Sequence, residues 1–162
     1  MAAKQNTHKL TKKSGYNILL MHGPNLNLLG KREPQIYGKM TLDDIHQELE
    51  IICQKSGVVL ECYQNNSEGA LISKTHECIG GGYDFLIINP AGYTHTSIAW
   101  RDALLAVNTP FIEVHLSNIF AREEFRHKSY FSDIAVGIIS GLGSTGYKLA
   151  LNYAINSLLE KE

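Results

Sequence analysis

The sequence has 162 residues, of which 44% are hydrophobic and 19% are charged, a composition that fits one globular domain. Its net charge of −1 at pH 7 argues against a protein dedicated to binding nucleic acid. No apolar run approaches the length of about 18 residues that a membrane-spanning helix needs. Three cysteines without a Cys-x-x-Cys pair form no disulfide framework. We therefore expect a cytoplasmic protein with no nucleic-acid and no membrane partner.

The charge is unevenly distributed along the chain. Four of the 15 basic residues lie in residues 1–16, which contain no acidic residue. The rest of the chain holds 11 basic and 16 acidic residues, a net charge of −5. We expect residues 1–15 to form a flexible N-terminal extension and residues 16–162 to form a single domain.

Apolar runs rich in β-branched residues alternate with helical patterns. The first helix is predicted to begin after Thr41, which resembles the N-cap of a capping box with Asp44, and to end at Gly57. Such alternation predicts a parallel sheet with helices on both faces, and five strands favour the flavodoxin-like, doubly wound order. The predicted strands are residues 17–21, 58–63, 84–89, 111–115 and 134–139, and the later helices are residues 70–79, 97–107 and 144–159.

Polar residues gather where three of these strands end. In α/β sheets ligands bind beyond the carboxyl ends of the strands, so these residues mark the expected site. They are Asn25 after the first strand, Asn89 and His95 after the third, and Glu113 and His115 at the end of the fourth.

Glu113 and His115 are two positions apart on a strand, so their side chains face the same way. A carboxylate beside an imidazole raises the imidazole pKa and fixes its orientation, as a general acid requires. A structural ion pair at a strand end is an equally good interpretation. For His95 a role at the start of the following helix and a role in ligand binding both remain open.

The connection from Gly23 to Met40 is longer than an ordinary strand–helix loop. Gly30 and Gly38 bracket a segment that contains Arg32 and Tyr37. Glycines at both ends of a charged loop resemble the hinges of a lid, although a solvated surface loop has the same pattern.

Two charged segments are read first as solvated surface. One is Arg101 and Asp102 within the third predicted helix, and the other is the basic run of residues 121–128. In the second segment Arg126 is the candidate for reaching a substrate or a subunit contact.

Three other patterns are weaker. Residues 141–146 match G-x-G-x-x-G, but no strand follows them, so we expect a tight turn with close helix–sheet packing rather than a dinucleotide site. His22, His95 and His115 could converge at this edge of the sheet, yet no HExxH motif or Cys/His pairing supports zinc. The cysteines are expected in helices (Cys53, Cys78) and a strand (Cys62), away from the polar residues, which argues against a cysteine nucleophile.

Four motifs occur in register between about Tyr16 and Tyr153. They are GPNLNLLG at residues 23–30 with REP at 32–34 and YG at 37–38, NPAGYTHTS at 89–97, IEVHLSN at 112–118 and AREEFRH at 121–127. Together they resemble the type II 3-dehydroquinate dehydratases. The resemblance implies reversible dehydration of 3-dehydroquinate to 3-dehydroshikimate, in the shikimate pathway of aromatic amino acid biosynthesis or in quinate breakdown. It also implies an anti elimination through an enolate, without metal, Schiff base or organic cofactor.

The resemblance assigns catalytic roles to five residues. Tyr37 is the base that removes the proton next to the ketone, and Arg32 supplies positive charge that lowers the tyrosine pKa from its usual value of about 10. Asn25 stabilises the enolate through a bound water. His115 is the general acid that protonates the departing hydroxyl, and Glu113 orients it.

The same resemblance assigns the groups that hold the substrate, and it implies a homo-oligomer, a dodecamer built from trimers. A flavodoxin-like small-molecule binding module without catalysis is the alternative. An FMN phosphate site would need serine or threonine after the first strand, and residues 23–30 contain neither. The implied substrate-binding groups are the amides of Leu116 and Ser117 with the Ser117 hydroxyl for the carboxylate, Asn89, His95 and Arg126 for the ring hydroxyls, and Asp102 from a neighbouring subunit.

Overall fold

The computed structural model describes residues 15–31 and 40–160. Five parallel strands form one sheet in the order β2-β1-β3-β4-β5. This order confirms the predicted flavodoxin-like topology, in which the chain reverses its direction across the sheet between β1 and β3. The strands are β1 (Asn17–His22), β2 (Val59–Gln64), β3 (Phe85–Asn89), β4 (Phe111–His115) and β5 (Gly137–Ser140).

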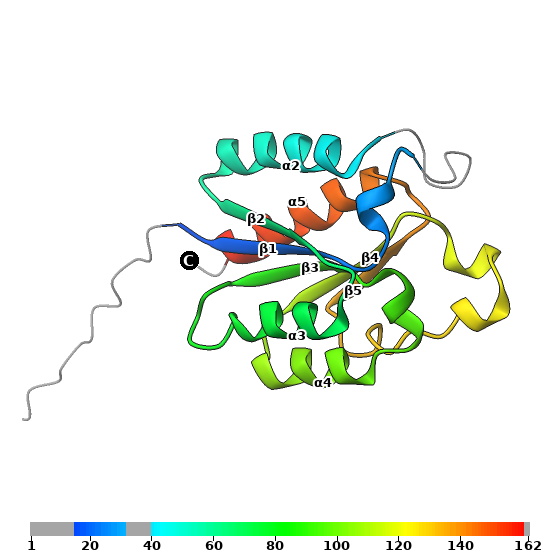
Figure 1. Ribbon diagram of the computed structural model, residues 1–162. Helices are drawn as coiled ribbons and strands as arrows, with labels where there is room; N and C mark the ends of the chain where they lie inside the picture. The colour runs from blue at the N-terminus through cyan, green and yellow to red at the C-terminus, as the bar shows by residue number, and fades with distance from the viewer. Residues whose placement is uncertain (1–14, 32–39, 161–162) are drawn as a thin grey trace, which may run out of the picture.

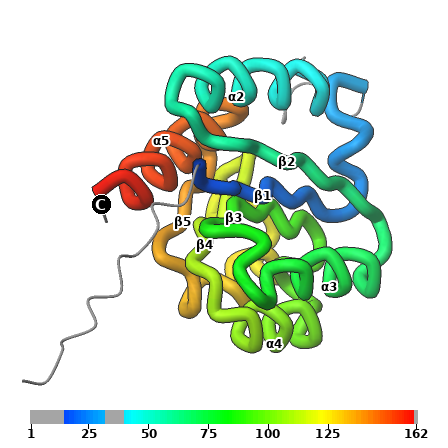
Figure 2. Tube along the Cα trace, turned by 90° about the vertical axis from the view of Figure 1, so that its left-hand side faces the viewer, coloured from blue at the N-terminus to red at the C-terminus, as the bar shows by residue number. Residues whose placement is uncertain are grey.

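Helices cover both faces of the sheet (Figure 1). Helices α2 (Leu42–Ser56) and α5 (Thr145–Leu159) pack on one face, and α3 (Glu68–His76) and α4 (Ile98–Val107) pack on the other, as the turned view also shows (Figure 2). None of the helices in the described ranges has the length and apolar character needed to cross a membrane. Residues 1–14 of the predicted N-terminal extension lie outside the described residues.

The central strands are buried on both faces, which explains their continuous apolar runs. In β1, Ile18 and Leu20 pack into the core beneath α2 and α5, whereas Leu19 and Met21 pack into the core beneath α3 and α4. Successive strand residues point to opposite faces, so one strand serves both cores. The edge strands β2 and β5 are more exposed to solvent than the central ones; in β2, for example, Val59 is 59% exposed.

Helix α2 begins as predicted. The Thr41 hydroxyl accepts a hydrogen bond from the Asp44 backbone N–H (3.1 Å), and the Asp44 carboxylate accepts one from the Thr41 N–H (2.9 Å). These bonds form the predicted capping box. The pKa of Asp44 is lowered mainly by a further bond, which the Thr41 hydroxyl donates to its carboxylate (2.7 Å), and then by the bond from the Thr41 N–H. The helix ends at Gly57, whose φ of 68° is in the left-handed region that favours glycine.

Two predicted elements have different ends, and the remaining ones agree within one residue at each end. Helix α3 begins earlier because Ser67 caps it, and it gives way after His76 to a turn of i to i+3 hydrogen bonds that contains Cys78, which was expected in the helix. Strand β5 begins later because the backbone N–H groups of Ile134 and Ala135 donate to the Phe131 carbonyl in a turn.

Two glycine contacts bring the loops and the last helix close to the sheet. The Gly23 N–H donates to the Asn89 carbonyl at 2.8 Å, and a Cβ at residue 23 would lie 2.2 Å from the Pro90 carbonyl oxygen. Only glycine therefore allows the loops after β1 and β3 to approach so closely. A Cβ on Gly146 would lie 3.2 Å from Ile139, so the G-x-G-x-x-G segment provides the predicted close helix–sheet packing.

Candidate active site

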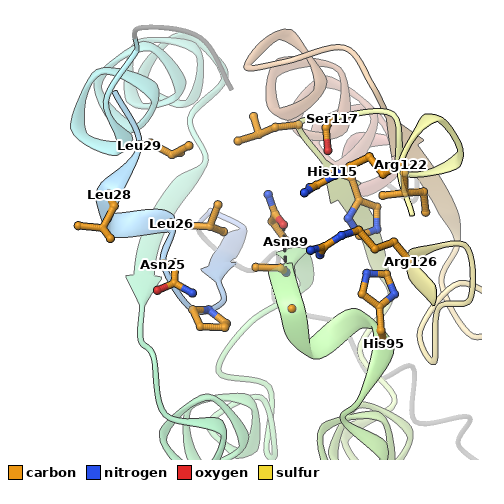
Figure 3. Close-up of a pocket in the computed structure, with 15 residues that line it drawn as sticks. Asn25, Leu26, Leu28, Leu29, Asn89, His95, His115, Ser117, Arg122 and Arg126 are labelled. Carbon is orange, nitrogen blue, oxygen red and sulfur yellow. Dashed lines mark hydrogen bonds between the residues drawn. The ribbon is translucent and has the colours of Figure 1, made fainter. Parts of the chain in front are cut away.

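A cavity of about 280 Å³ opens beyond the carboxyl ends of β1, β3 and β4 (Figure 3). This is the edge of the sheet at which the sequence predicts the site. The cavity lies at the topological switch point, where parallel α/β proteins bind their ligands. Its polar lining residues are Asn25, Asn89, His95, His115, Ser117, Arg122 and Arg126.

Asn25 forms the wall of the pocket on the β1 side. It adopts the left-handed conformation (φ 67°), which asparagine tolerates better than most residues, and its backbone N–H donates to the Asn66 side chain at 2.9 Å. The short helical turn η1 (Leu26–Leu28) follows it. In Figure 3, Asn25 and Leu26 face His95 and Arg126 across the pocket.

Asn89 lies at the floor of the pocket, at the end of β3. It is 3% exposed, and both ends of its side-chain amide are held by the protein. Oδ1 accepts from the Ala91 N–H (3.2 Å), and Nδ2 donates to the Tyr147 hydroxyl (2.8 Å). The orientation of the amide is therefore fixed before any ligand binds.

His95 ends the turn η2 (Ala91–His95), which follows β3. Its Nδ1 donates to the Lys128 carbonyl at 2.7 Å. Burial lowers the pKa of His95, although the Lys128 carbonyl acts in the opposite direction. A neutral ring that donates from Nδ1 leaves Nε2 as an acceptor, and His95 lines the pocket. The ring is therefore suited to accept a hydrogen bond from a hydroxyl group.

Glu113 and His115 form the predicted pair. Nε2 of His115 lies 2.6 Å from Oε1 of Glu113, a residue with no exposed surface. Two hydroxyl groups complete the shell of the carboxylate, since Ser129 donates to Oε1 (2.8 Å) and Ser132 donates to Oε2 (2.6 Å). Because Nε2 of His115 is bonded to Glu113, Nδ1 is the ring nitrogen of His115 that is left to interact with a ligand in the pocket.

These contacts keep Glu113 ionised. Burial alone would raise the pKa of Glu113, but the hydrogen bond and charge of His115 and the two serine hydroxyls outweigh burial and hold this pKa below its ordinary value. An ionised carboxylate only accepts hydrogen bonds, so His115 donates from Nε2. The tautomer and orientation of the ring follow from this single contact.

The segment after β4 supplies both arginines of the pocket. It contains the turns η3 (Ile119–Ala121) and η4 (Glu124–Arg126). Arg122 and Arg126 are half-buried pocket residues, and Glu123 orients the second of them by accepting from its Nε at 2.8 Å. The interpretation of this run as solvated surface is therefore wrong for both arginines, which place positive charge where an anionic group can bind.

Leu116 and Ser117 lie at the end of β4, and the following elements fix their backbone. The Leu116 carbonyl accepts from the Gly143 N–H at 2.9 Å, and the Ser117 carbonyl accepts from the Ser140 hydroxyl at 3.1 Å. Both residues line the pocket. The turn before α5 thus holds the backbone that is predicted to bind a carboxylate.

The pocket does not contain every predicted site residue. Glu113 lies behind His115, to which it is bonded, and does not line the pocket. Asp102 is exposed on α4 and does not line the pocket of its own chain. Tyr37 and Arg32 lie outside the described residues.

Sequence reasoning missed several functional neighbours. Arg122 could have been found from its spacing of four residues from Arg126. Ser129 and Ser132 carry no local signal, because only the tertiary fold brings them to Glu113.

His22 does not join the other two histidines. It is completely buried against Tyr147 and His46, and it does not line the pocket. Within residues 15–31 and 40–160, no group of three or more histidine, cysteine, aspartate or glutamate side chains is arranged to hold a metal ion. Burial raises the pKa of Cys53 to about 11 and of Cys62 to about 12, so neither thiol is a ready nucleophile.

The fold and the pocket define a class of protein. It is a flavodoxin-like α/β protein whose cavity is lined by an oriented histidine, two arginines and two amide side chains. A family model described as dehydroquinase class II matches residues 16–155. The chain therefore belongs to the type II 3-dehydroquinate dehydratases.

Individual relatives agree with this assignment. The chain is 62% identical over 138 residues to a 3-dehydroquinate dehydratase of Nitrosomonas eutropha, a match that covers 85% of this chain and 95% of the relative. It is 63% identical over 142 residues to the enzyme of Haemophilus ducreyi, covering 88% and 98% respectively. The crystal structure of a type II dehydroquinase from Butyrivibrio crossotus matches with a TM-score of 0.84 at 44% identity, over 87% of this chain and 98% of that one.

Proposed function

We propose that this chain converts 3-dehydroquinate reversibly to 3-dehydroshikimate and water, by an anti elimination through an enolate. The observation that carries the mechanism is the pocket-lining His115, held 2.6 Å from the buried Glu113 carboxylate, which also accepts from two serine hydroxyls. A histidine oriented in this way is suited to transfer a proton to a leaving group. The arginines on the same side of the pocket suit a substrate that carries a carboxylate.

Proton removal is assigned to Tyr37. The phenolate takes the proton from the carbon next to the ketone, and the electron pair of the C–H bond moves toward the carbonyl oxygen to form the enolate. Arg32 favours the phenolate by its positive charge. Asn25 lines the pocket and stabilises the enolate oxygen through a bound water. The roles of Tyr37 and Arg32 rest on the motif resemblance.

Loss of the hydroxyl completes the reaction. The enolate re-forms the ketone, its electrons expel the hydroxyl at the β carbon, and His115 donates a proton so that water departs. Glu113 stabilises the positively charged imidazole and holds it in place. No metal, Schiff base or organic cofactor takes part in this proposal.

The remaining pocket residues hold the substrate. Asn89, His95 and Arg126, which line the pocket, present hydrogen-bonding groups for the ring hydroxyls. The Leu116 and Ser117 amides, with the Ser117 hydroxyl, bind the substrate carboxylate.

Assembly and cellular role extend the proposal. Asp102 is exposed on α4, as expected of a residue that completes the site of a neighbouring subunit. On the basis of the motif resemblance, we propose a dodecamer built from trimers. The enzyme acts in the cytoplasm, in aromatic amino acid biosynthesis or in quinate breakdown.

An absorbance assay tests the proposal, because the product is a conjugated enone that absorbs in the ultraviolet. Purified protein should form the enone from 3-dehydroquinate at a rate unchanged by a chelator or by borohydride. Absence of the enone would refute the activity, and inhibition by borohydride would refute a mechanism without a Schiff base.

A pair of tyrosine variants tests the base. Tyr37→Phe should reduce kcat by about 10²-fold or more, because general bases contribute about 10²–10⁴-fold. Tyr153→Phe makes the same chemical change on α5, outside the pocket, and should leave kcat unchanged. Full activity of Tyr37→Phe would exclude Tyr37 as the base.

A further inference from the structure

A chain of buried polar side chains connects Asn89 to helix α2 behind the pocket. Asn89 Nδ2 lies 2.8 Å from Tyr147 Oη. Tyr147 Oη lies 3.1 Å from Nδ1 of His22, and Nε2 of His22 lies 3.0 Å from Nε2 of His46. Tyr147 and His22 have no exposed surface, and His46 is half-buried. We call Tyr147, His22 and His46 the backing residues.

One fixed donor, together with the need of the buried Tyr147 hydroxyl for an acceptor, sets the direction of the hydrogen bonds in this chain. Among the described residues, His22 Nδ1 is the acceptor within hydrogen-bond distance of that hydroxyl. The backbone N–H of Ala91 can only donate, and its acceptor is Asn89 Oδ1, 3.2 Å away. Asn89 therefore presents its Nδ2 hydrogens to Tyr147, whose oxygen accepts. The Tyr147 hydroxyl in turn donates to Nδ1 of His22. His22 then donates from Nε2 to Nε2 of His46, which must be unprotonated at that nitrogen.

Burial keeps the two inner groups in the neutral forms that this direction needs. It raises the pKa of Tyr147 well above its ordinary value, although the hydrogen bond from Asn89 acts in the opposite direction. Burial, and then the charge of a protonated His46, lower the pKa of His22 well below its ordinary value. Near neutral pH, Tyr147 keeps its proton and His22 carries only one. A neutral imidazole has one donor and one acceptor, and the chain uses both.

The backing residues determine which Asn89 groups remain for a ligand. Asn89 uses one Nδ2 hydrogen on Tyr147 and one Oδ1 lone pair on Ala91, so one donor position and one acceptor position of the amide remain. A hydroxyl group both donates and accepts, and it matches this pair. The opposite amide orientation would set Nδ2 against the Ala91 N–H, donor against donor. Tyr147 and Ala91 together therefore select one orientation.

We propose that Tyr147, oriented by His22, is a positioning residue that fixes the Asn89 amide for binding a hydroxyl group of the substrate. This inference rests on the proposed function, in which Asn89 holds a ring hydroxyl. Tyr147 itself does not touch the substrate. Its hydroxyl acts through Asn89, so its effect must disappear when the Asn89 side chain is removed.

A double-mutant cycle on the enone assay tests this dependence. Tyr147→Phe keeps the ring and removes the acceptor, and it should raise KM about tenfold while kcat changes less than about twofold, because Asn89 is proposed to bind the substrate and not to transfer a proton. In an Asn89→Ala background, Tyr147→Phe should change KM by less than about twofold. Tyr153→Phe, the matched loss of a phenol hydroxyl on α5, should have no effect in either background.

The outcomes separate this inference from the proposed function. Equal effects of Tyr147→Phe in both backgrounds, or an unchanged KM in the single variant, would overturn the positioning role. Absence of turnover in the unmodified enzyme would overturn the proposed function instead.

A second measurement needs no substrate and no Tyr147 variant. Nitrogen-15 NMR of histidine-labelled enzyme near neutral pH should find His22 protonated at Nε2 and His46 at Nδ1, with His46→Gln used for assignment. His22 protonated at Nδ1 would overturn the inference even if Tyr147→Phe failed to fold.

Discussion

Replacing Ser132 with alanine removes one of the two hydroxyl groups that bind the buried Glu113 carboxylate. Ser132 Oγ lies 2.6 Å from Oε2, whereas His115 and Ser129 both bind Oε1. Within the described residues, Ser132 is thus the donor that serves Oε2. The substitution leaves that oxygen of a fully buried anion without its protein partner.

The expected loss of stability follows from the negative charge on the acceptor, the Glu113 carboxylate. A hydrogen bond to a charged group contributes about 1.5–3 kcal/mol, compared with about 1 kcal/mol for a neutral pair. We therefore expect Ser132→Ala to lower the free energy of unfolding by about 2 kcal/mol at neutral pH, which lowers Tm by roughly 4–8 °C for a chain of this size. Because Glu113 orients His115, kcat should fall as well.

The loss depends on pH in a direction that the structure defines. The Glu113 pKa is lowered in the fold, so its contribution to stability is present above the unfolded pKa, near 4.5, and is lost as the pH falls through the folded pKa. Ser132→Ala removes one cause of this lowering. The difference in stability between the variant and the unmodified enzyme should therefore be full at neutral pH and shrink as the pH drops below about 4.5.

Thermal unfolding across this pH range measures the effect. Ser56→Ala is the matched control, because its hydroxyl donates to the neutral Ile52 carbonyl at 3.1 Å and its loss should be independent of pH. If Ser132→Ala had the same cost at acidic and neutral pH, or no cost at neutral pH, the argument from the buried carboxylate would be refuted.

Three further substitutions test other contacts. Gly23→Ala places a Cβ about 2.2 Å from the Pro90 carbonyl oxygen and should lower the free energy of unfolding by more than about 3 kcal/mol. A Tm close to that of the unmodified enzyme would contradict the close approach of the loops after β1 and β3. Lys74→Met removes an ammonium group that lies 2.5 Å from the Glu61 carboxylate and 2.6 Å from that of Glu77, both half-exposed. The substitution should lower the free energy of unfolding by about 1–2 kcal/mol and leave kcat unchanged. An unchanged Tm would contradict this prediction. Arg32→Ala should lower kcat and move the rising limb of the pH–rate profile to higher pH, and an unmoved limb would show that Arg32 does not lower the Tyr37 pKa.

The parts of the fold that sequence predicts well are those with local signals. The Thr41 capping box and Gly57 define both ends of α2, and the buried run of β4 agrees with its predicted range. The start of β5 was missed because Ile134 and Ala135 have strand-like side chains but bond to the Phe131 carbonyl in a turn. Apolar character indicates burial there, while the backbone hydrogen bonds decide the conformation.

For the site as well, contacts between residues close in sequence are predictable, whereas contacts between distant residues are not. The spacing of Glu113 and His115 predicts their contact, because strand geometry alone places them on one face. The Lys128 carbonyl that fixes His95 lies 33 residues away in sequence, and the Tyr147 hydroxyl that fixes Asn89 lies 58 residues away. Such partners have no periodic signature, so single-sequence reasoning identified residues that line the pocket more readily than the residues that hold them in place.

The loop that carries Ser132 is also tied to the molecular surface. Its neighbour Asp133, 65% exposed, accepts from Arg101 of α4 at 2.9 Å, and Arg101 also donates to the Tyr130 carbonyl at 2.7 Å. Dissolved salt screens an exposed ion pair of this kind. We therefore expect ionic strength to affect the position of the proposed general acid through this loop, in addition to weakening the attraction between the pocket and an anionic substrate.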